Sequence, residues 1–260
     1  AESDDGCKAL RFTSGECHDR MNKYFCTFGW ILAFLCVHSV VHGQNKRLID
    51  SLELRAQTAT VDSVKVMFLN KCAAYYIRYD ISKAEEALQR GALATSNFSS
   101  NWSDSSSYLR HRAWVRMLHG NYNLRQNNYP EALGFYHEAL RLYEQTGFHR
   151  GVGDCYNGIG SIYYSLKDFD KAAQYFSLAA PAFEKAGNLE GVMVVYSNVG
   201  SILANQADYP GAIQQTLKAE RIVREKKLLK YEAAIYADLT RYFMRIDSFE
   251  NARWYVEKER

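Results

Sequence analysis

The apolar positions of this chain follow a helical spacing, and the pattern recurs every 40 residues. After Phe169, small and apolar residues return at intervals that place them on one face of a helix. Glycines recur with the same period at Gly120, Gly160 and Gly200. Because the apolar pattern and the glycines recur with the same period, the sequence indicates a supersecondary unit repeated in tandem, as in a solenoid, rather than a single globular core. The residues on the helical face after Phe169 are Ala172, Ala173, Phe176, Ala179, Ala180 and Phe183.

Each unit is interpreted as two helices joined by a short polar turn. In one unit the turn ends at Phe169, where the second helix begins, and Pro130 and Pro210 follow the corresponding aromatic residue in two other units. Proline is accommodated there because the first turn of a helix leaves its N–H groups unbonded. The face of the first helix is marked by Tyr156, Ile159, Gly160 and Tyr163. We therefore expect an all-α fold of stacked antiparallel helical hairpins, with Gly160 where the two helices cross.

This pattern resembles the tetratricopeptide repeat (TPR) family, in which Leu-Gly and a tyrosine are followed by alanine, an aromatic residue and alanine. The common unit of that family has about 34 residues, and the 40-residue period resembles a longer version of it. The resemblance covers about residues 60–260 and implies a solenoid that forms a right-handed superhelix. HEAT-like packing is the alternative arrangement. The residues that carry the match are Tyr156, Ile159, Gly160, Tyr163, Ala172, Phe176 and Ala179.

The chain divides into segments with different patterns. Residues 1–20 are polar and are interpreted as upstream or disordered sequence, residues 21–43 as a signal peptide or signal anchor, and residues 44–59 as a linker. A serine-rich stretch at residues 96–107 interrupts the period and is expected to be a long loop. The TPR solenoid is expected at 60–260, in about five hairpins with the last one truncated: 60–96, 105–148, 149–188, 189–228 and 229–260.

An apolar stretch in the N-terminal part predicts export. No charged residue lies between Tyr24 and Val41, directly after Lys23, and Val41 and Gly43 are suitable for signal peptidase to cleave before Gln44. An uncleaved membrane anchor is the alternative, because about 20 apolar residues can span a bilayer. A buried core helix is the third interpretation, and the charge-free run after a lysine favours export over it.

The composition and the absence of known motifs argue against a catalytic, metal-binding or nucleic-acid-binding function. The net charge of +3 is too balanced to indicate nucleic acid or acidic lipid as a partner. The sequence contains no zinc-protease, Cys-x-x-Cys, nucleophile-elbow or phosphate-loop motif. We therefore expect no catalytic residues, no metal, no cofactor and no enzymatic activity. Cys72 and Cys155 are expected to be buried apolar residues rather than a disulfide.

A polar stripe on the first helices is the candidate partner-binding surface. Its residues recur at spacing four within a helix and at spacing 40 between units, so they share one face. In the TPR family this face lines a concave groove, and the resemblance implies a protein or peptide partner there. Ordinary solvated helix positions are the alternative. The stripe comprises Met117, Asn121, Arg125, Asn157, Ser161, Ser165, Ser201, Asn205, Arg241 and Arg245, with Ser197 and Ala237 in the same phase.

The order of a signal, a short unit and 40-residue repeats resembles the exported N-terminal part of bacterial TPR signalling proteins of Bacteroidetes type. In those proteins a transmembrane helix and a histidine kinase, DNA-binding or cyclase domain follow. The resemblance implies a non-catalytic scaffold in the periplasm or cell envelope, the sensory or partner-binding region of a larger protein. Membrane attachment would come only from an uncleaved anchor or a further C-terminal helix. The alternatives are a platform for a catalytic domain beyond residue 260 and a free periplasmic adaptor.

Export predicts a specific mature N-terminus. Protein recovered from the cell envelope should begin at Gln44, in part cyclised, when it is analysed by mass spectrometry. Intact protein that starts at Met21 in the cytosol would contradict export, and intact protein in the membrane fraction would favour the anchor.

Overall fold

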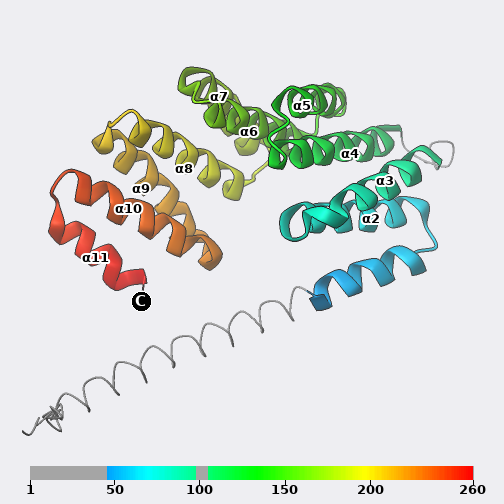
Figure 1. Ribbon diagram of the computed structural model, residues 1–260, viewed down its shortest axis with the longest axis horizontal. Helices are drawn as coiled ribbons and strands as arrows, with labels where there is room; N and C mark the ends of the chain where they lie inside the picture. Colours follow the sequence, from blue (N-terminus) through cyan, green and yellow to red (C-terminus); the bar gives the residue numbers. More distant parts are fainter. Residues whose placement is uncertain (1–45, 98–104, 260) are drawn as a thin grey trace, which may run out of the picture. The chain divides into compact units, whose positions relative to one another are not determined.

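The computed structural model describes residues 46–97 and 105–259, and one compact unit extends from Leu52 onward. Every regular element in these ranges is a helix, so the expected all-α fold is confirmed for the described residues. The helices form antiparallel hairpins that follow one another in chain order (Figure 1). These are α2 (Asp62–Tyr79) with α3 (Ile81–Asn97), α4 (Ser105–Arg125) with α5 (Tyr129–Gln145), α6 (His149–Ser165) with α7 (Phe169–Lys185), α8 (Leu189–Asn205) with α9 (Tyr209–Lys226), and α10 (Glu232–Arg245) with α11 (Phe249–Glu259), with the 3-10 helix η2 (Leu229–Tyr231) before α10.

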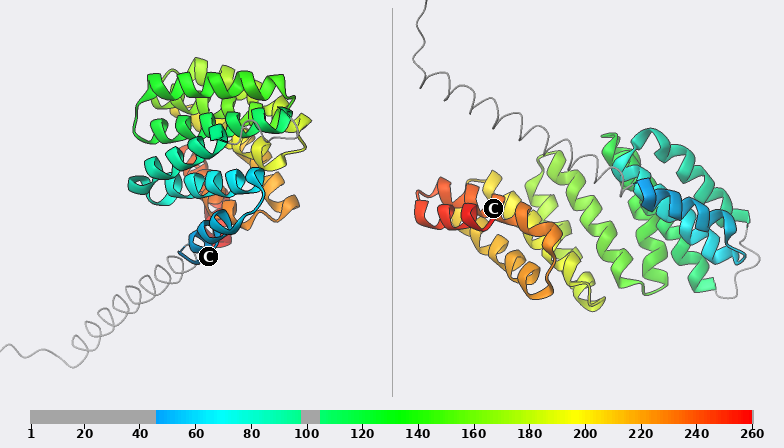
Figure 2. Two further views of the ribbon diagram at one scale, coloured as in Figure 1. Left: turned by 90° about the vertical axis from the view of Figure 1, so that its right-hand side faces the viewer. Right: turned by 90° about the horizontal axis from the view of Figure 1, so that it is seen from below.

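Each hairpin packs on its neighbours in the chain. Helix α6, for example, packs against its partner α7 and against α5 of the preceding hairpin, and the same arrangement recurs at α8 (Figure 2). The first helices also touch one another directly, α2 with α4, α4 with α6 and α6 with α8. This nearest-neighbour packing is typical of a solenoid. The contacts between first helices create a continuous surface, which we call the first-helix face.

The turns inside the hairpins repeat one geometry. In the four hairpins from α4 to α11, each turn contains one residue in the left-handed region, which ends the first helix and reverses the chain. The turn between α2 and α3 differs, because Asp80 has φ −150°. The side chains of Asp168 and Asp208 then accept hydrogen bonds from the backbone N–H groups of Lys171 (3.2 Å) and Gly211 (3.0 Å), which caps the second helix. The left-handed residues lie 40 apart: Asn127 (φ 61°), Lys167 (φ 62°), Ala207 (φ 62°) and Asp247 (φ 56°).

The cores of the α4–α5 and α6–α7 hairpins depend on a glycine that faces an aromatic ring. A Cβ atom added at Gly160 would lie 2.7 Å from a ring carbon of Phe176, which is 1% exposed. Gly120 faces Tyr136 in the same way in the preceding hairpin. The expectation that Gly160 lies at the helix crossing is therefore confirmed, because only a residue without a side chain permits this approach.

The segment at 44–59 differs from the expected linker, because residues 46–58 are helical. Arg90 donates two hydrogen bonds, of 3.1 and 2.8 Å, to the carboxylate of Glu53, and Ala56 is buried in a small cluster with residues of α2 and α3. These contacts join positions far apart in the sequence, which the repeat pattern does not reveal.

The loop expected in the serine-rich stretch is also shorter than the stretch itself. Helix α3 continues to Asn97 and α4 begins at Ser105, so both ends of the 96–107 stretch are helical. The segments expected upstream, 1–20 and 21–43, lie outside the described residues. Within 46–97 and 105–259, no helix combines the length and apolar character that a membrane span requires.

Both cysteines of the described ranges are buried free thiols, as expected. Cys72 lies on α2 and Cys155 on α6. Burial raises the pKa of Cys72 to about 12 and also raises that of Cys155. A thiol with a raised pKa is a poor nucleophile and metal ligand at neutral pH, so both act as small apolar core residues.

The contact between Gly160 and Phe176 predicts opposite effects on stability for two glycine-to-alanine substitutions. Gly160→Ala should lower the free energy of unfolding by about 1 kcal/mol or more, because overpacking against Phe176 outweighs the gain in helix propensity. Gly134→Ala, in the exposed interior of α5 with no atom within 4 Å of the added Cβ, should instead raise it by about 1 kcal/mol. Urea unfolding measures both. Equal effects of the two substitutions would contradict the packing argument.

Candidate functional site

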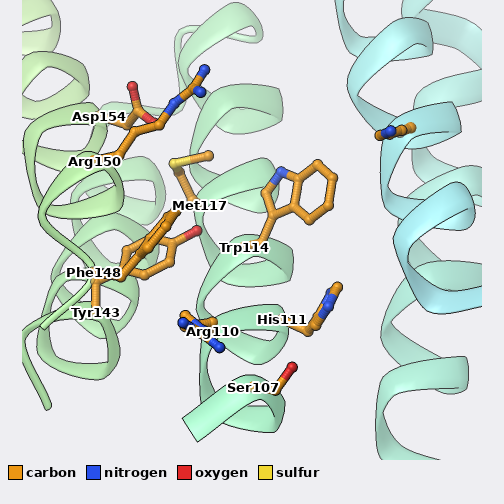
Figure 3. Close-up of a pocket in the computed structure, with 10 residues that line it drawn as sticks. Ser107, Arg110, His111, Trp114, Met117, Tyr143, Phe148, Arg150 and Asp154 are labelled. Atoms are coloured by element: carbon orange, nitrogen blue, oxygen red, sulfur yellow. The ribbon is translucent and has the colours of Figure 1, made fainter. Parts of the chain in front are cut away.

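A cavity of about 630 Å³ opens on the first-helix face. Helix α4 forms its floor, α6 forms one side and α2 contributes Lys71 (Figure 3). Its volume falls in the range of about 300–1,000 Å³ that is usual for ligand pockets. The lining residues are Lys71, Ser107, Arg110, His111, Trp114, Met117, Tyr143, Phe148, Arg150 and Asp154.

The cavity continues the polar stripe toward the beginnings of the helices. On α4 the series Arg110, Trp114 and Met117 has the three- and four-residue spacing of one helix face, and the stripe residue Asn121 comes next. On α6 the corresponding residues are Arg150 and Asp154. The stripe residue Met117 belongs to both, because it also lines the cavity. The cavity and the stripe are therefore parts of one surface.

The apolar part of the lining consists of aromatic rings and a thioether. The ring centroids of Tyr143 and Phe148 are 5.4 Å apart, and Trp114 lies 6.2 Å from the ring of His111. Tyr143 is buried, whereas Phe148 is 37% exposed at the rim. Aromatic surfaces that remain open to solvent are typical anchors for a partner's apolar side chains.

The charged part of the lining is predominantly cationic. Three basic residues, Lys71, Arg110 and Arg150, line the cavity together with one carboxyl group, that of Asp154. Burial lowers the pKa of His111, and the nearby Arg110 lowers it further, so this imidazole is neutral at pH 7. Figure 3 shows the side chains of Arg150 and Asp154 next to each other on α6, close to Met117.

Asp154 is held in an unfavourable environment for a carboxylate. Burial raises its pKa from 3.8 to about 6, although Arg150 acts in the opposite direction, and Glu190 of α8 adds to the rise. The desolvation cost therefore outweighs the attraction of the nearby guanidinium group. A perturbed carboxyl group in a cavity is a frequent property of functional sites.

Several amide groups of the polar stripe hold neighbouring helices together. The hydroxyl of Tyr136 donates to Oδ1 of Asn121 (2.6 Å). Asn198 donates to Oδ1 of Asn157 (2.9 Å), and Asn205 donates to the hydroxyl of Tyr164 (2.8 Å), in both cases between consecutive hairpins. These side chains therefore stabilise the stack, whatever they do for a partner.

The hydroxyl groups of the stripe bond within their own helices. Ser161, Ser165 and Ser201 each donate to the backbone carbonyl oxygen four residues earlier, at 2.9, 3.0 and 3.1 Å. Such bonds satisfy the hydroxyl donors locally and leave the oxygen lone pairs available as acceptors.

The cations of the stripe have different environments. Arg125 donates to the backbone carbonyl oxygen of Arg78 (2.9 Å). Arg241 bonds the carboxylate of Asp238 (2.6 Å) and lies over the ring of Tyr242. Arg245 is exposed near the end of α10. The use of these residues by a partner stays a prediction.

The sequence pattern alone missed most of the cavity residues. Trp114, Arg150 and Asp154 are in phase with the stripe but lie one to two turns closer to the helix N-termini. The equivalence of Arg110 and Arg150, 40 residues apart, was the available signal. Tyr143 and Phe148 lie together because of the turn between two hairpins, and the repeat pattern in the sequence does not indicate this contact.

Comparison with known proteins supports the repeat assignment. A tetratricopeptide repeat family model matches residues 110–185, which include most of α4 and all of α5, α6 and α7. The match is confined to these residues, and the described hairpins form a TPR-like solenoid. A search of curated proteins found no match to this sequence.

Solved structures with the same fold include proteins of different kinds. BtubC (BKLC) from P. vanneervenii is 17% identical with a TM-score of 0.60, over 84% of this chain and 87% of that protein. A Rap protein complexed with competence and sporulation factor is 16% identical with a TM-score of 0.60, over 85% and 71%. Aspartyl phosphate phosphatase F from Bacillus subtilis is 15% identical with a TM-score of 0.58, over 77% of this chain and 60% of that protein. At these identities the likeness shows the fold alone.

The environment of Asp154 predicts a pH-dependent stability. Since its folded-state pKa is raised to about 6, the folded protein binds more protons than the unfolded chain at intermediate pH, and stability falls as pH rises from about 4 to 6. Asp154→Asn should raise the free energy of unfolding by about 1–3 kcal/mol at neutral pH and have little effect near pH 4.

Urea unfolding at several pH values measures this difference. Asp170→Asn, at an exposed position in the first turn of α7, is the matched control for the loss of one negative charge. A benefit of Asp154→Asn that is the same at both pH values would contradict the proposed burial cost.

Proposed function

We propose that this protein is a scaffold that binds a protein or peptide partner on its first-helix face. The observation that carries the proposal is the continuity of the 630 Å³ cavity with the polar stripe on α4 and α6. Aromatic surface, cations and hydrogen-bonding groups are combined along one face, which is the composition of a binding surface.

The rigid placement of this face supports the proposal. Asn157 and Asn205 are each bonded to a residue of a neighbouring hairpin, so the face is preorganised and little ordering is needed on binding. The similarity to a Rap protein complexed with competence and sporulation factor indicates that a solenoid of this kind can accommodate another molecule. That complex describes the other protein, and for this chain the partner is part of the proposal.

The geometry favours binding over catalysis. The cavity offers charges that stabilise a complementary charge and rings that pack against apolar groups. Its carboxyl group, Asp154, lies near Arg150 on one helix. In the part of the chain that the structure describes, no three His, Cys, Asp or Glu side chains are placed to share a metal ion. Absence of enzymatic activity stays a prediction.

We further propose that the scaffold is exported and serves as the sensory or partner-binding region of a larger bacterial signalling protein. The charge-free run after Lys23 and the order of signal and repeats support this. A free periplasmic adaptor and a platform for a catalytic domain beyond residue 260 are the competing proposals. Extension of the reading frame past Arg260 distinguishes a kinase core, a hydrolase and a stop codon.

The first-helix face can be tested with two matched double variants. Arg241→Ala with Arg245→Ala removes two cations from α10, at the end of the polar stripe. Arg221→Ala with Arg253→Ala removes two exposed arginines from the second helices α9 and α11, where each pairs with a glutamate of its own helix. The first pair should weaken partner binding by about 2 kcal/mol or more, and the second should leave it nearly unchanged.

The measurement is a quantitative pull-down from an envelope extract, followed by titration with the captured partner. Urea unfolding of both double variants controls for stability. Equal loss in the two variants, or loss only in the Arg221 and Arg253 pair, would contradict the assignment of the face.

A further inference from the structure

A second group of arginines lies on the side of α4 that points away from the polar stripe. Helix α4 lies between α3 and α5 (Figure 1). Arg112 follows two residues after Arg110, which lines the cavity on the first-helix face, and two residues turn the direction on a helix by about 200°. Arg116 comes one turn later, on the same side as Arg112. These two arginines therefore belong to a different surface of the scaffold.

The next two hairpins carry valine and tyrosine at the positions of these two arginines. There the valines and tyrosines pack against the buried clusters of α5 to α8. Arg112 is exposed instead, and the side chain of Arg116 is 37% exposed. The arginines replace residues that stabilise the stack, which indicates a role other than packing. The equivalent residues are Val152 and Tyr156 in one hairpin and Val192 and Tyr196 in the next.

The arginines line a cleft of about 230 Å³ formed by α4 and α5. Helix α5 contributes a third guanidinium group, that of Arg141, and one carboxylate, that of Glu138. Glu138 pairs with Arg116 at 3.1 Å. In the part of the chain that the structure describes, Arg112 and Arg141 form no hydrogen bond or ion pair. Three positive groups and one negative group leave the lining with an excess of two positive charges.

The charge and the donors of this cleft match a phosphate group. Guanidinium N–H groups bind phosphate oxygens with paired, charge-assisted hydrogen bonds. A phosphate monoester carries about −1.5 to −2 charges at pH 7, which balances the excess in the cleft, whereas one carboxylate would balance only half of it. The amide of Gln145 adds a donor, and Leu142 offers an apolar wall to the carbon next to the ester oxygen.

We propose that the cleft between α4 and α5 binds a phosphate monoester. Arg112 and Arg141 bind its oxygens, and Arg116 is shared between the ligand and Glu138. The cleft is smaller than the range of about 300–1,000 Å³ that is usual for whole ligands, so it takes the phosphate and the atoms next to it. A phosphorylated side chain and a small phosphate compound share this chemistry. The site is independent of partner binding on the first-helix face.

Isothermal titration calorimetry of the full chain at constant ionic strength tests the inference with three probes. These are inorganic phosphate, the peptide Gly-Ala-phosphoserine-Ala-Gly, and the same peptide with glutamate in place of phosphoserine. We expect the tighter of the two phosphate-bearing probes to bind about tenfold more tightly than the glutamate peptide. Tighter binding of the phosphopeptide assigns the site to a phosphorylated side chain, and tighter binding of inorganic phosphate assigns it to a small phosphate compound.

Two results of this titration would overturn the inference. The first is that neither phosphate-bearing probe binds. The second is that the glutamate peptide binds as tightly as the better phosphate-bearing probe, because the cleft would then attract any anion.

A matched pair of variants locates the ligand. Arg112→Gln with Arg141→Gln should weaken the better probe by about tenfold or more, because both guanidinium groups contact the phosphate. Arg221→Gln is the control, since Arg221 lies 80 residues after Arg141 at the equivalent exposed position of α9, without arginines on the first helix beside it. It should leave the affinity unchanged. Equal effects in the two variants would contradict the site, and urea unfolding confirms that both remain folded.

A substitution that improves binding provides a test that loss of the fold cannot imitate. Glu138→Gln removes the carboxylate that competes for Arg116, so the better probe should bind about three- to tenfold more tightly. Glu225→Gln removes a carboxylate from the exposed pair with Arg221 on α9 and should have no effect. Unchanged or weaker binding to Glu138→Gln would show that the phosphate does not lie beside Arg116 and would refute the proposal.

Discussion

The close approach of a first-helix glycine to a side chain of the second helix determines how the three hairpins from α4 to α9 are built. Gly120 lies against Tyr136 and Gly160 against Phe176, and an added Cβ atom would lie 3.1 Å from the first ring and 2.7 Å from the second. Gly200 takes the same position against Thr216. Because the contact recurs in phase, consecutive hairpins have nearly the same internal geometry and stack in a constant register. Tyr136 links this packing to the surface, since its hydroxyl bonds Asn121 of the polar stripe.

Constant register brings residues about 40 apart into direct contact. The bonds from Asn198 to Asn157 and from Asn205 to Tyr164, and the Lys230–Glu190 ion pair, all join such positions. The stripe is therefore partly a structural seam between hairpins. This dual use has a physical benefit for binding, because side chains that are already held in place lose little conformational entropy when a partner arrives. It also means that substitutions at Asn157 or Asn205 would change the stack as well as the surface, whereas the exposed arginines can be changed more selectively.

Periodicity explains which features the sequence could predict. The helix faces and the Gly160–Phe176 crossing repeat, so a single chain contains several copies of the same signal. The helix at 46–58 has no copy and depends on the long-range Glu53–Arg90 ion pair, which no local pattern reveals. The cavity was missed for a related reason. Its aromatic residues Tyr143 and Phe148 come from a helix end and a turn, and the raised pKa of Asp154 results from burial by neighbouring hairpins.

The candidate site thus lies where equivalent surface positions of successive hairpins carry different residues. At one repeat position the chain carries Arg110 and Arg150, which both line the cavity, and then Glu190 and Lys230, which form an ion pair. Trp114 and Asp154 are likewise equivalent positions with different chemistry. A solenoid whose units were identical would present a uniform stripe with no preferred place for a ligand. Deviations at exposed surface positions cost little stability, because few core contacts depend on them. They are therefore the positions at which this fold can acquire specificity.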